Sequence, residues 1–581
     1  MFDPLVTRRF LCMQIKNKEE VMKRKTVKLF TGMLSMLCAC SLSAQEANRI
    51  ESENYTQGLT ALENDSLELA MTYFAQELEE HPDNGYVYAH MAVIQYRAAE
   101  YGNALAAVNE AIESIPLEDK EYRSYIYVTR AHVYLQLADT TQALCDLEQA
   151  IQNAPDESRL YETRAQLYYD QGNYAQSDAD YQRMIDLDES DAMGYMGLGR
   201  NAKAQALYEE AIRQFDYVNK LYPNYDQPYA FRSDCYIAMK RYDLALDDVI
   251  CALDLDHGDK SFYNLLLLAD SAFTLTVNKL KVQKMKKPEA RYFAYDLGVI
   301  HERAKKYREA IPYYEESFAL DDDADDAYRL AHCYNQLGDF DSALRFCDQA
   351  ILLDAEENRY LHLKACLLDH MGRSEEAILA MSECIAREPD QVLAYYTRGW
   401  FEEHTGKSQA AIDDFTMSIT LDPTYAYAYL NRGVIYMRMG EQARAEEDFR
   451  RVIALETEPE KAECAFYAYY YLGDKGTAIT WLNKVLEKGD EGDYYDAACL
   501  YAEMGEQKKA LNYLRESLHR GFRRFAHIRR DRMLDNIRNL PAFEELLKEY
   551  EAIHAEEVKL SYVSPSGECY LRSIDGSLTM Q

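Results

Sequence analysis

The chain is 581 residues long, has only 24 glycines and 13 prolines, and is 48% hydrophobic. Scarce glycine and proline argue against a loop-rich all-β fold, and the hydrophobic content argues against global disorder. The formal net charge is −35, so the chain as a whole would repel the phosphates of nucleic acid and of anionic lipid. We therefore expect a protein or peptide partner with basic or neutral segments, and no nucleic acid.

The N-terminus has the order of residues that is typical of a secretory signal peptide. From Met22 the sequence reads MKRKTVKLFTGMLSMLCACSLSAQ, which is a basic start, an apolar stretch and then small residues. The apolar stretch is short for a membrane span. We expect residues 1–44 to be removed after Ala44, with Met22 as an alternative start. The sequence then predicts an exported bacterial protein, periplasmic or envelope-associated, without a transmembrane span. Leu37-Cys38-Ala39-Cys40 also resembles a loose lipobox, so a lipoprotein with its lipid anchor at Cys40 is the alternative.

From Glu51 onward the sequence repeats with a period of 34 residues. Pro82 and Pro116 are 34 residues apart, and so are Pro389 and Pro423. With each such proline set as position 32, positions 8 and 20 are small in almost every unit, and position 24 is often aromatic. Small residues allow two antiparallel helices to cross closely, and proline ends the second helix of the pair. The pattern therefore predicts a row of helical hairpins.

One unit shows the pattern clearly, with Gly199, Ala211 and Phe215 at positions 8, 20 and 24. In period and in every main signature position, residues 51–524 resemble the tetratricopeptide repeat (TPR) family. The resemblance implies an all-α fold, a right-handed superhelical α-solenoid of about 14 hairpins. The units start near residues 51, 85, 124, 158, 192, 226, 260, 291, 324, 358, 392, 426, 459 and 491.

Residues 260–290 depart from the pattern because they lack both small positions. We expect an irregular helical unit there, as a bend between an N-terminal lobe, 51–259, and a C-terminal lobe, 291–524. Residues 525–553 predict a helix that caps the last hairpin, which a terminal repeat requires. The tail, 554–581, alternates like a strand at best, and we expect it to be poorly ordered.

Positions 2, 5, 9, 12 and 13 face the concave groove in the family that the chain resembles. In the C-terminal lobe they hold aromatic rings, histidines and a few charges, which suit an extended peptide or a partner helix because rigid rings give contact area at low entropy cost. Solvated filler is the alternative interpretation. The candidate partner-binding residues are Tyr292, Tyr295, Tyr328, His332, Asn335, His362, Tyr396, Trp400, Glu403, His404, Tyr427 and Arg438. The carboxylate clamp of the family's co-chaperones is absent, since Tyr396 and Trp400 replace its lysine and asparagine.

Motifs for catalysis or metal binding do not assemble in the sequence. GYMGLG at 194–199 lacks the spacing of a dinucleotide-binding loop, and DDDADD at 321–326 lacks the glycine and the glutamate of an EF-hand. The histidines form no HExxH motif. We therefore predict that the chain is not an enzyme and binds no metal or cofactor. The basic stretches at 279–287 and 520–532 are interpreted as pairing with acidic neighbours in the solenoid, in preference to a nucleic-acid patch.

The cysteines and the tail leave alternatives open. Cys333/Cys347 and Cys366/Cys384 each lie on opposite helices of one hairpin, where buried thiols are preferred over disulfides. The function predicted is a non-enzymatic scaffold that binds a peptide or protein in the cell envelope. The alternative is the regulatory arm of an envelope enzyme. It depends on YVSPSGECYLRSIDG in the tail, which faintly resembles the opening strands of aspartic protease domains but lacks their catalytic Asp-Thr-Gly.

Overall fold

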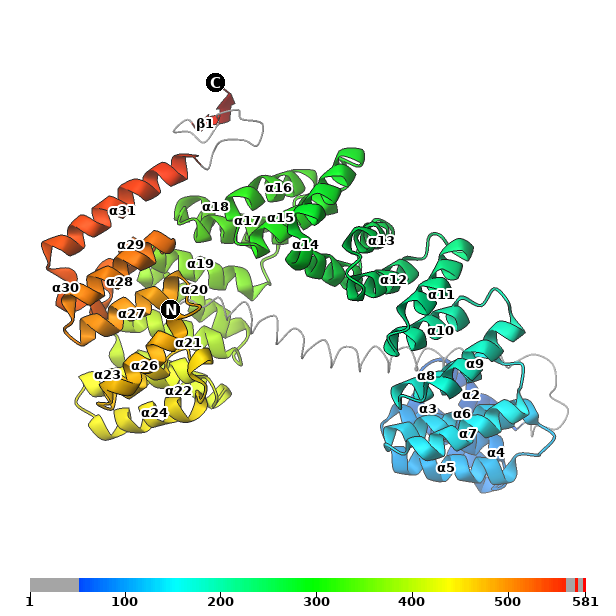
Figure 1. Cartoon of the computed structure of the whole chain (residues 1–581). Coiled ribbons are helices and arrows are strands. Elements are labelled where there is room, and N and C mark those ends of the chain that lie inside the picture. Colours follow the sequence, from blue (N-terminus) through cyan, green and yellow to red (C-terminus); the bar gives the residue numbers. More distant parts are fainter. Residues whose placement is uncertain (1–51, 561–569, 573–577, 581) are drawn as a thin grey trace. The chain divides into compact units, whose positions relative to one another are not determined.

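The computed structural model describes residues 52–560, 570–572 and 578–580 (Figure 1). The expected signal peptide and lipobox lie outside these residues, as does much of the tail. The chain divides between Thr276 and Val277 into two compact units, which we call the N-terminal unit (52–276) and the C-terminal unit (277–560). No helix among the described residues is both long and apolar enough to cross a membrane.

Each unit is a row of antiparallel helix pairs, which confirms the predicted all-α solenoid of about 14 hairpins. The N-terminal unit holds α2 (Glu53–Glu63), α3 (Leu67–Glu80), α4 (Gly85–Arg97), α5 (Tyr101–Ser114), α6 (Lys120–Gln136), α7 (Thr140–Asn153), α8 (Ser158–Asp170), α9 (Tyr174–Leu187), α10 (Ala192–Ala204), α11 (Tyr208–Leu221), α12 (Asp226–Ala238), α13 (Tyr242–Leu255) and the start of α14 (Asp259–Lys286).

The C-terminal unit continues the same arrangement. It holds α15 (Arg291–Arg303), α16 (Tyr307–Leu320), α17 (Ala324–Gln336), α18 (Phe340–Leu353), α19 (Asn358–His370), α20 (Ser374–Arg387), α21 (Val392–His404), α22 (Ser408–Leu421), α23 (Ala426–Arg438), α24 (Gln442–Leu455), η1 (Pro459–Lys461), α25 (Ala465–Tyr471), α26 (Lys475–Leu486), α27 (Glu491–Glu503) and α28 (Gln507–Arg520). Beyond the hairpins, the strands β1 (Tyr570–Arg572) and β2 (Leu578–Met580) pair antiparallel, with Tyr570 opposite Met580.

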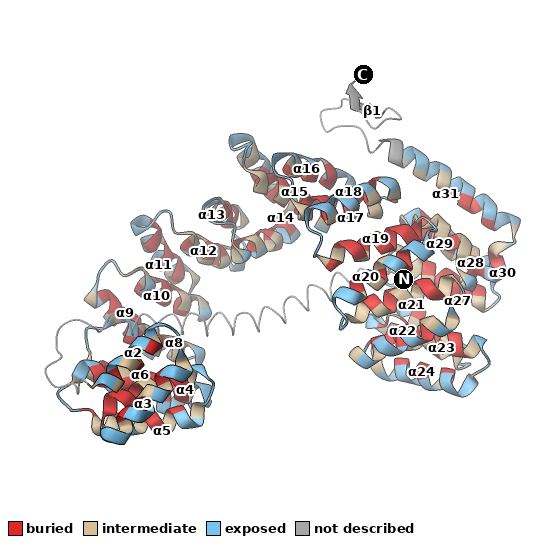
Figure 2. Ribbon diagram, turned by 180° about the vertical axis from the view of Figure 1, so that it is seen from behind, coloured by how far each residue is buried: buried red, intermediate tan, exposed pale blue. Residues whose placement is uncertain are grey.

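The small residues at position 8 allow the two helices of a hairpin to approach closely. A Cβ on Gly199 would lie 2.5 Å from the ring of Phe215, and one on Gly298 would lie 2.6 Å from the ring of Tyr314. Both rings, at position 24 of the same hairpin, are fully buried. Figure 2 shows the result in each row, with buried residues on the helix faces that meet and exposed residues on the outer faces.

Five hairpins share an arginine that the sequence analysis did not identify. The guanidinium at position 7 donates two hydrogen bonds of 2.5 to 3.0 Å to the aspartate at position 23 of the same hairpin. In four of the five, another N–H reaches back to the preceding hairpin. The pairs are Arg130–Asp146, Arg164–Asp180, Arg232–Asp248, Arg398–Asp414 and Arg432–Asp448. A planar guanidinium suits this bidentate geometry, so the pairs fix the register of neighbouring helices.

Residues 260–290 contain most of α14, which consists of two helical stretches separated at Ala272 by non-helical backbone angles (φ −148°, ψ 51°). The border between the two units, at 276/277, lies in the second half of this helix. The segment predicted to be irregular therefore holds two helical stretches that meet at a kink at Ala272.

The segment after α28 differs from the single capping helix that was predicted for 525–553. It forms α29 (Phe525–Arg530), η2 (Arg532–Leu534), α30 (Asp535–Arg538) and α31 (Pro541–Leu560). The first break falls at Asp531, whose backbone is extended and whose carboxylate accepts from the Met533 amide. The second falls before Pro541, which begins α31 because proline suits a first helical turn. The tail prediction is corrected at its start, since α31 runs on to Leu560.

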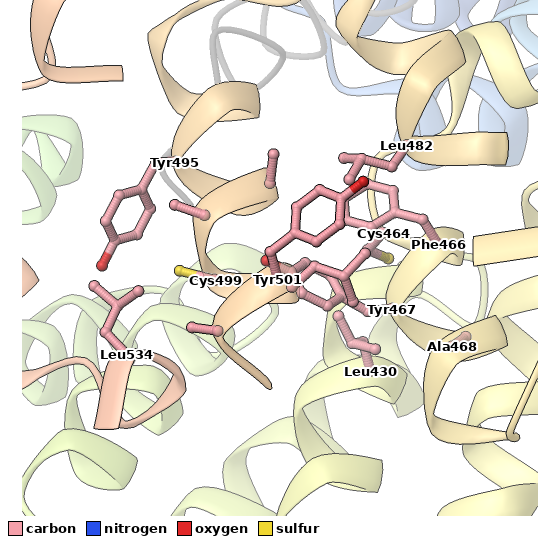
Figure 3. Close-up of a cluster of buried hydrophobic side chains, with 14 of the residues drawn as sticks. Leu430, Cys464, Phe466, Tyr467, Ala468, Leu482, Tyr495, Cys499, Tyr501 and Leu534 are labelled. Carbon is pink, nitrogen blue, oxygen red and sulfur yellow. The ribbon is translucent and has the colours of Figure 1, made fainter. Parts of the chain in front are cut away.

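The core of the C-terminal unit continues from the last hairpins into this capping segment (Figure 3). Tyr467 and Tyr495 are buried beside Cys499, and Leu534 of the capping segment closes the cluster. In α31, Phe543 and the leucines that follow it pack into the same core. Burial of this apolar surface holds the capping segment to the last hairpin.

Candidate partner-binding groove

The twelve predicted groove residues lie on the first helices of five consecutive hairpins, α15, α17, α19, α21 and α23. Ten are partly buried, Tyr396 is buried and Arg438 is exposed. Helical periodicity puts positions 2, 5, 9, 12 and 13 on one face of each helix. The structure therefore gathers these side chains in one row within the C-terminal unit.

Many of these residues connect one helix of the row to the next. Glu403 binds Arg438 at 2.7 Å, an ion pair between α21 and α23. Four hydrogen bonds between neighbouring helices are Tyr295 to Asp325 (2.7 Å), Asn335 to His370 (3.2 Å), His362 to Thr397 (3.1 Å) and Asn431 to Tyr396 (3.0 Å). The partners are 30 to 35 residues apart in the chain, the spacing of one repeat. The polar face is therefore held together from helix to helix.

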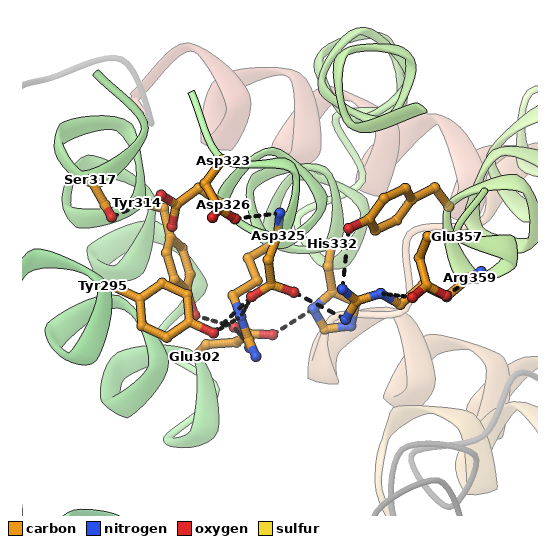
Figure 4. A network of polar contacts seen from close by, with 12 residues as sticks. Tyr295, Glu302, Tyr314, Ser317, Asp323, Asp325, Asp326, His332, Glu357 and Arg359 are labelled. Carbon is orange, nitrogen blue, oxygen red and sulfur yellow. Dashed lines mark hydrogen bonds and ion pairs between the residues drawn. The ribbon is translucent and has the colours of Figure 1, made fainter. Parts of the chain in front are cut away.

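A polar network on this face contains Tyr295, Glu302 and Asp325 (Figure 4), and these three residues share Arg329 of α17 as a hydrogen-bond partner. The Arg329 guanidinium donates to the Tyr295 hydroxyl (2.9 Å), to Asp325 (2.9 Å) and to Glu302 (3.2 Å). Glu302 also pairs with His332 Nδ1 at 2.9 Å. Of these five residues, only Tyr295 and His332 were predicted from the sequence as groove residues. The charged members were missed because buried charges and solvated ones look alike in a sequence.

Burial and neighbouring charges set the ionisation of the face. Burial alone would raise the pKa of Glu302, but the hydrogen bond and charge of His332, with the charge of Arg329, hold that pKa at about 2. Burial lowers the pKa of His362 to about 4 and raises that of Tyr328 to about 12. At neutral pH the face therefore carries an ionised Glu302, a neutral His362 and an intact Tyr328 hydroxyl.

The part of the row formed by α19 and α21 is in contact with the chain's own capping segment. Arg530 of α29 donates to the Asp369 carbonyl at 2.7 Å, and Arg532 pairs with Glu403 at 3.1 Å. The ring of His527 lies 5.3 Å from that of Trp400. The basic stretch at 520–532 thus pairs with acidic neighbours, as the sequence analysis predicted. That the pairing occurs at the candidate groove could not be seen in the sequence.

The remaining row residues have contacts of their own. Tyr292 packs beside Phe293, with ring centroids 4.5 Å apart, and Tyr427 lies 6.3 Å from Tyr396. The ring of His404 meets that of Trp400 edge to face, with centroids 3.7 Å apart. These side chains of the row are therefore packed against their neighbours in the chain.

The same unit contains four cysteines of two hairpins that were considered as disulfide partners. Cys333, Cys347, Cys366 and Cys384 are all buried and free in the structure. Burial raises the pKa of the Cys347 thiol to about 12. No cluster of His, Cys, Asp and Glu among the described residues has the arrangement of a metal site.

Comparison with known families identifies the repeat. Tetratricopeptide repeat models match residues 128–192, 303–367, 362–426 and 426–458. The repeats within these ranges are tetratricopeptide repeats. A model of anaphase-promoting complex subunit 5 also matches residues 47–121.

Several relatives of this TPR array share short stretches or parts of the fold. An F-box/TPR repeat protein of Schizosaccharomyces pombe is 37% identical over 71 residues, which are 11% of this chain and 12% of that protein. The C-terminal part of a TPR protein from Cytophaga hutchinsonii is 16% identical, with 46% of this chain and 95% of that chain covered and a TM-score of 0.35. A TPR protein from Parabacteroides merdae is 18% identical, with 43% and 97% covered and a TM-score of 0.33.

Proposed function

We propose that this TPR chain is an exported scaffold that binds a protein or peptide partner on the polar and aromatic face of its C-terminal unit. Tetratricopeptide repeats support protein–protein interaction, and the TPR fold is typically a non-enzymatic scaffold. The observation that carries the proposal is the helix-to-helix network around Arg329, which holds the Tyr295 ring in a fixed place. Rings that are rigid before binding lose little entropy when a partner docks. A solvated surface would not need such a network.

Two tyrosines on α23 provide a matched test of this proposal. Tyr427 is in the candidate row beside Tyr396, whereas Tyr429 lies outside the row, with its hydroxyl bonded to the Pro423 carbonyl at 3.3 Å. Both are partly buried. We expect Tyr427→Ala to weaken binding of a purified partner about tenfold or more, as loss of an aromatic anchor does. Tyr429→Ala should leave binding unchanged.

Partners for this test can be recovered from envelope extract with the full chain as bait and then purified. Binding is then measured by calorimetry for the wild-type chain and for each variant. Equal binding by Tyr427→Ala and the wild-type chain would contradict the proposed face. Equal losses in Tyr427→Ala and Tyr429→Ala would show a general effect on α23 and would contradict it too.

The cellular location is the second part of the proposal. It is supported by the basic, apolar and small-residue order of residues 22–44. The intact mass of the protein purified from its native cells tests it. Export predicts a chain that begins at Gln45, or an acylated chain that begins at Cys40. A full-length mass would contradict export by cleavage.

A further inference from the structure

We propose that the groove of the C-terminal unit recognises an arginine-bearing segment, and that residues 523–532 of the chain are its resident ligand, which a partner displaces. This inference deepens the proposed function and rests on it, because it names the kind of partner that the same face accepts. The capping segment is seated between the row helices and the last hairpin. Its contacts therefore show which chemistry the face selects.

The first contact is a socket for a guanidinium at the end of α19. Arg530 donates to the Asp369 carbonyl at 2.7 Å and lies 3.3 and 3.4 Å from its two carboxylate oxygens. It also donates to Ser374 Oγ at 2.7 Å. The carbonyls in the last turn of a helix carry partial negative charge, which favours a cation there. Asp369 is fully buried, so its charge needs this pairing.

Burial alone would raise the pKa of Asp369, but the hydrogen bond and charge of His404, with the charge of Arg530, lower it to about 2. With Arg530 in place, the Asp369 carboxylate is therefore ionised at neutral pH. A neutral or acidic side chain in place of Arg530 would leave that buried charge with less compensation.

The second contact is at Glu403 on α21. Its Oε1 is 3.1 Å from Arg532 and 2.7 Å from Arg438 of α23. Arg438 belongs to the row itself, so Glu403 is held in place before a ligand arrives. The guanidinium groups of Arg530 and Arg532, two residues apart in the chain, thus bind the carboxylates of Asp369 and Glu403, which lie on different hairpins. This spacing is more specific than general attraction to an acidic chain.

The third contact is a cluster of tilted rings around His527. The His527 ring lies 5.3 Å from Trp400, 5.5 Å from His404 and 5.5 Å from Tyr495. His527 is buried, and burial holds its pKa well below the usual range. The face therefore accepts a neutral ring at this point. A partner that replaces the segment should present an aromatic or histidine ring followed by two arginines.

The opposite side of the segment belongs to the core. Ile528 and Leu534 are fully buried among the residues of the last hairpins. Asp531 accepts a hydrogen bond from the Tyr495 hydroxyl at 2.8 Å. The groove contacts can consequently be removed by substitution at 527, 530 and 532 while these anchors remain. Such variants should keep the fold of the last hairpin.

The experiment measures binding of a labelled peptide with the sequence of residues 521–534 to the full chain, by fluorescence anisotropy. A segment tethered next to its own site has an effective concentration in the millimolar range. If the peptide alone binds the empty site with a Kd of about 10 μM, the resident segment suppresses its binding about 100-fold. We expect the His527→Ala/Arg530→Ala/Arg532→Ala chain to bind the peptide about 100-fold more tightly than the wild-type chain.

Two controls fix the interpretation. Arg529→Ala should bind the peptide as weakly as the wild-type chain, because Arg529 pairs with Glu551 of α31 and not with the groove. Adding Glu403→Gln to the triple variant should reduce peptide binding at least tenfold, and a peptide with alanine at 530 and 532 should not bind. Circular dichroism of each full-length variant verifies that it is folded.

Equal peptide binding by the folded triple variant and the wild-type chain would overturn the inference, and so would binding that Glu403→Gln leaves unchanged. These results are separate from failure of the proposed function. If the peptide does not bind but the purified partner still distinguishes Tyr427→Ala from Tyr429→Ala, only this inference fails. If the partner makes no such distinction while the peptide binds as expected, the groove recognises its own segment and the proposed function fails.

Discussion

The close crossing of α15 and α16 provides a quantitative test of how the repeat positions the groove. Replacing Gly298 by alanine would put a Cβ 2.6 Å from Tyr314 Cε1 and 2.7 Å from Cδ1. The Tyr314 ring is fully buried and its hydroxyl donates to Glu302, so the ring cannot move aside without losing that bond. Overpacking of this kind lowers the free energy of unfolding by about 1 to 3 kcal/mol, whereas replacing glycine by alanine within a helix raises it by roughly 0.5 to 1 kcal/mol.

The expected net loss is about 1 to 2 kcal/mol in the hairpin formed by α15 and α16. A repeat array need not unfold in one step, so the suitable assay is hydrogen exchange of these helices in the full chain. A loss of this size should speed their exchange about 5- to 30-fold. The matched control is Gly476→Ala on α26, where the nearest atom to an added Cβ is 3.7 Å away.

Gly476→Ala should leave hydrogen exchange of its own helix, α26, unchanged or slow it. The Tyr295 ring lies 6.0 Å from that of Tyr314, so the shift in Gly298→Ala should also reach the groove and weaken partner binding. Exchange of α15 and α16 that is as slow in Gly298→Ala as in the wild-type chain would refute the reasoning. It would mean that the ring has room to move and that position 8 does not set the hairpin spacing.

Three further predictions concern charge and reactivity. Arg398→Lys should lower the stability of its hairpin by about 1 to 2 kcal/mol, because lysine cannot make both bonds to Asp414; unchanged thermal unfolding would contradict this. The pKa of Asp369 lies at about 2, below the ordinary value of about 3.9. The ionised carboxylate therefore stabilises the fold fully above pH ~5, and this stabilisation is lost as pH falls through 2. Hydrogen exchange of α19 between pH 6 and 2 should show this loss of stability in acid. In the Asp369→Asn variant, most of this pH dependence should be absent. Cys145 is exposed and should react with a thiol reagent in the folded chain, whereas buried Cys347 should react only on unfolding, as timed labelling with mass spectrometry can show.

The sequence predicted the hairpins well because their signals are local and repeated. The small residue at position 8, such as Gly199 or Gly298, is required wherever two helices cross, and each unit repeats the requirement. The aspartates that pair with the position 7 arginines were missed for a different reason. Arg398 and Asp414 are 16 residues apart on two helices, and in an acidic chain such a pair looks like two solvated charges.

The candidate row could be predicted as positions but not as contacts. Tyr295 and His332 were identified from the repeat register, whereas their shared network depends on the burial of Arg329 and Glu302. The contact between the capping segment and the candidate row could not be predicted from the sequence at all. Arg530 and Asp369 are 161 residues apart, so their meeting depends on how the hairpins stack along the C-terminal unit. No local pattern encodes that stacking.

The most direct test of the central claim places a photo-reactive phenylalanine analogue at position 427 or at position 429 of the full chain. Both positions are on α23, and only 427 is in the candidate row. With a purified partner, irradiation should crosslink the chain from 427 and not from 429. Crosslinking from 429 alone, or equally from both positions, would contradict binding on this face of the C-terminal unit.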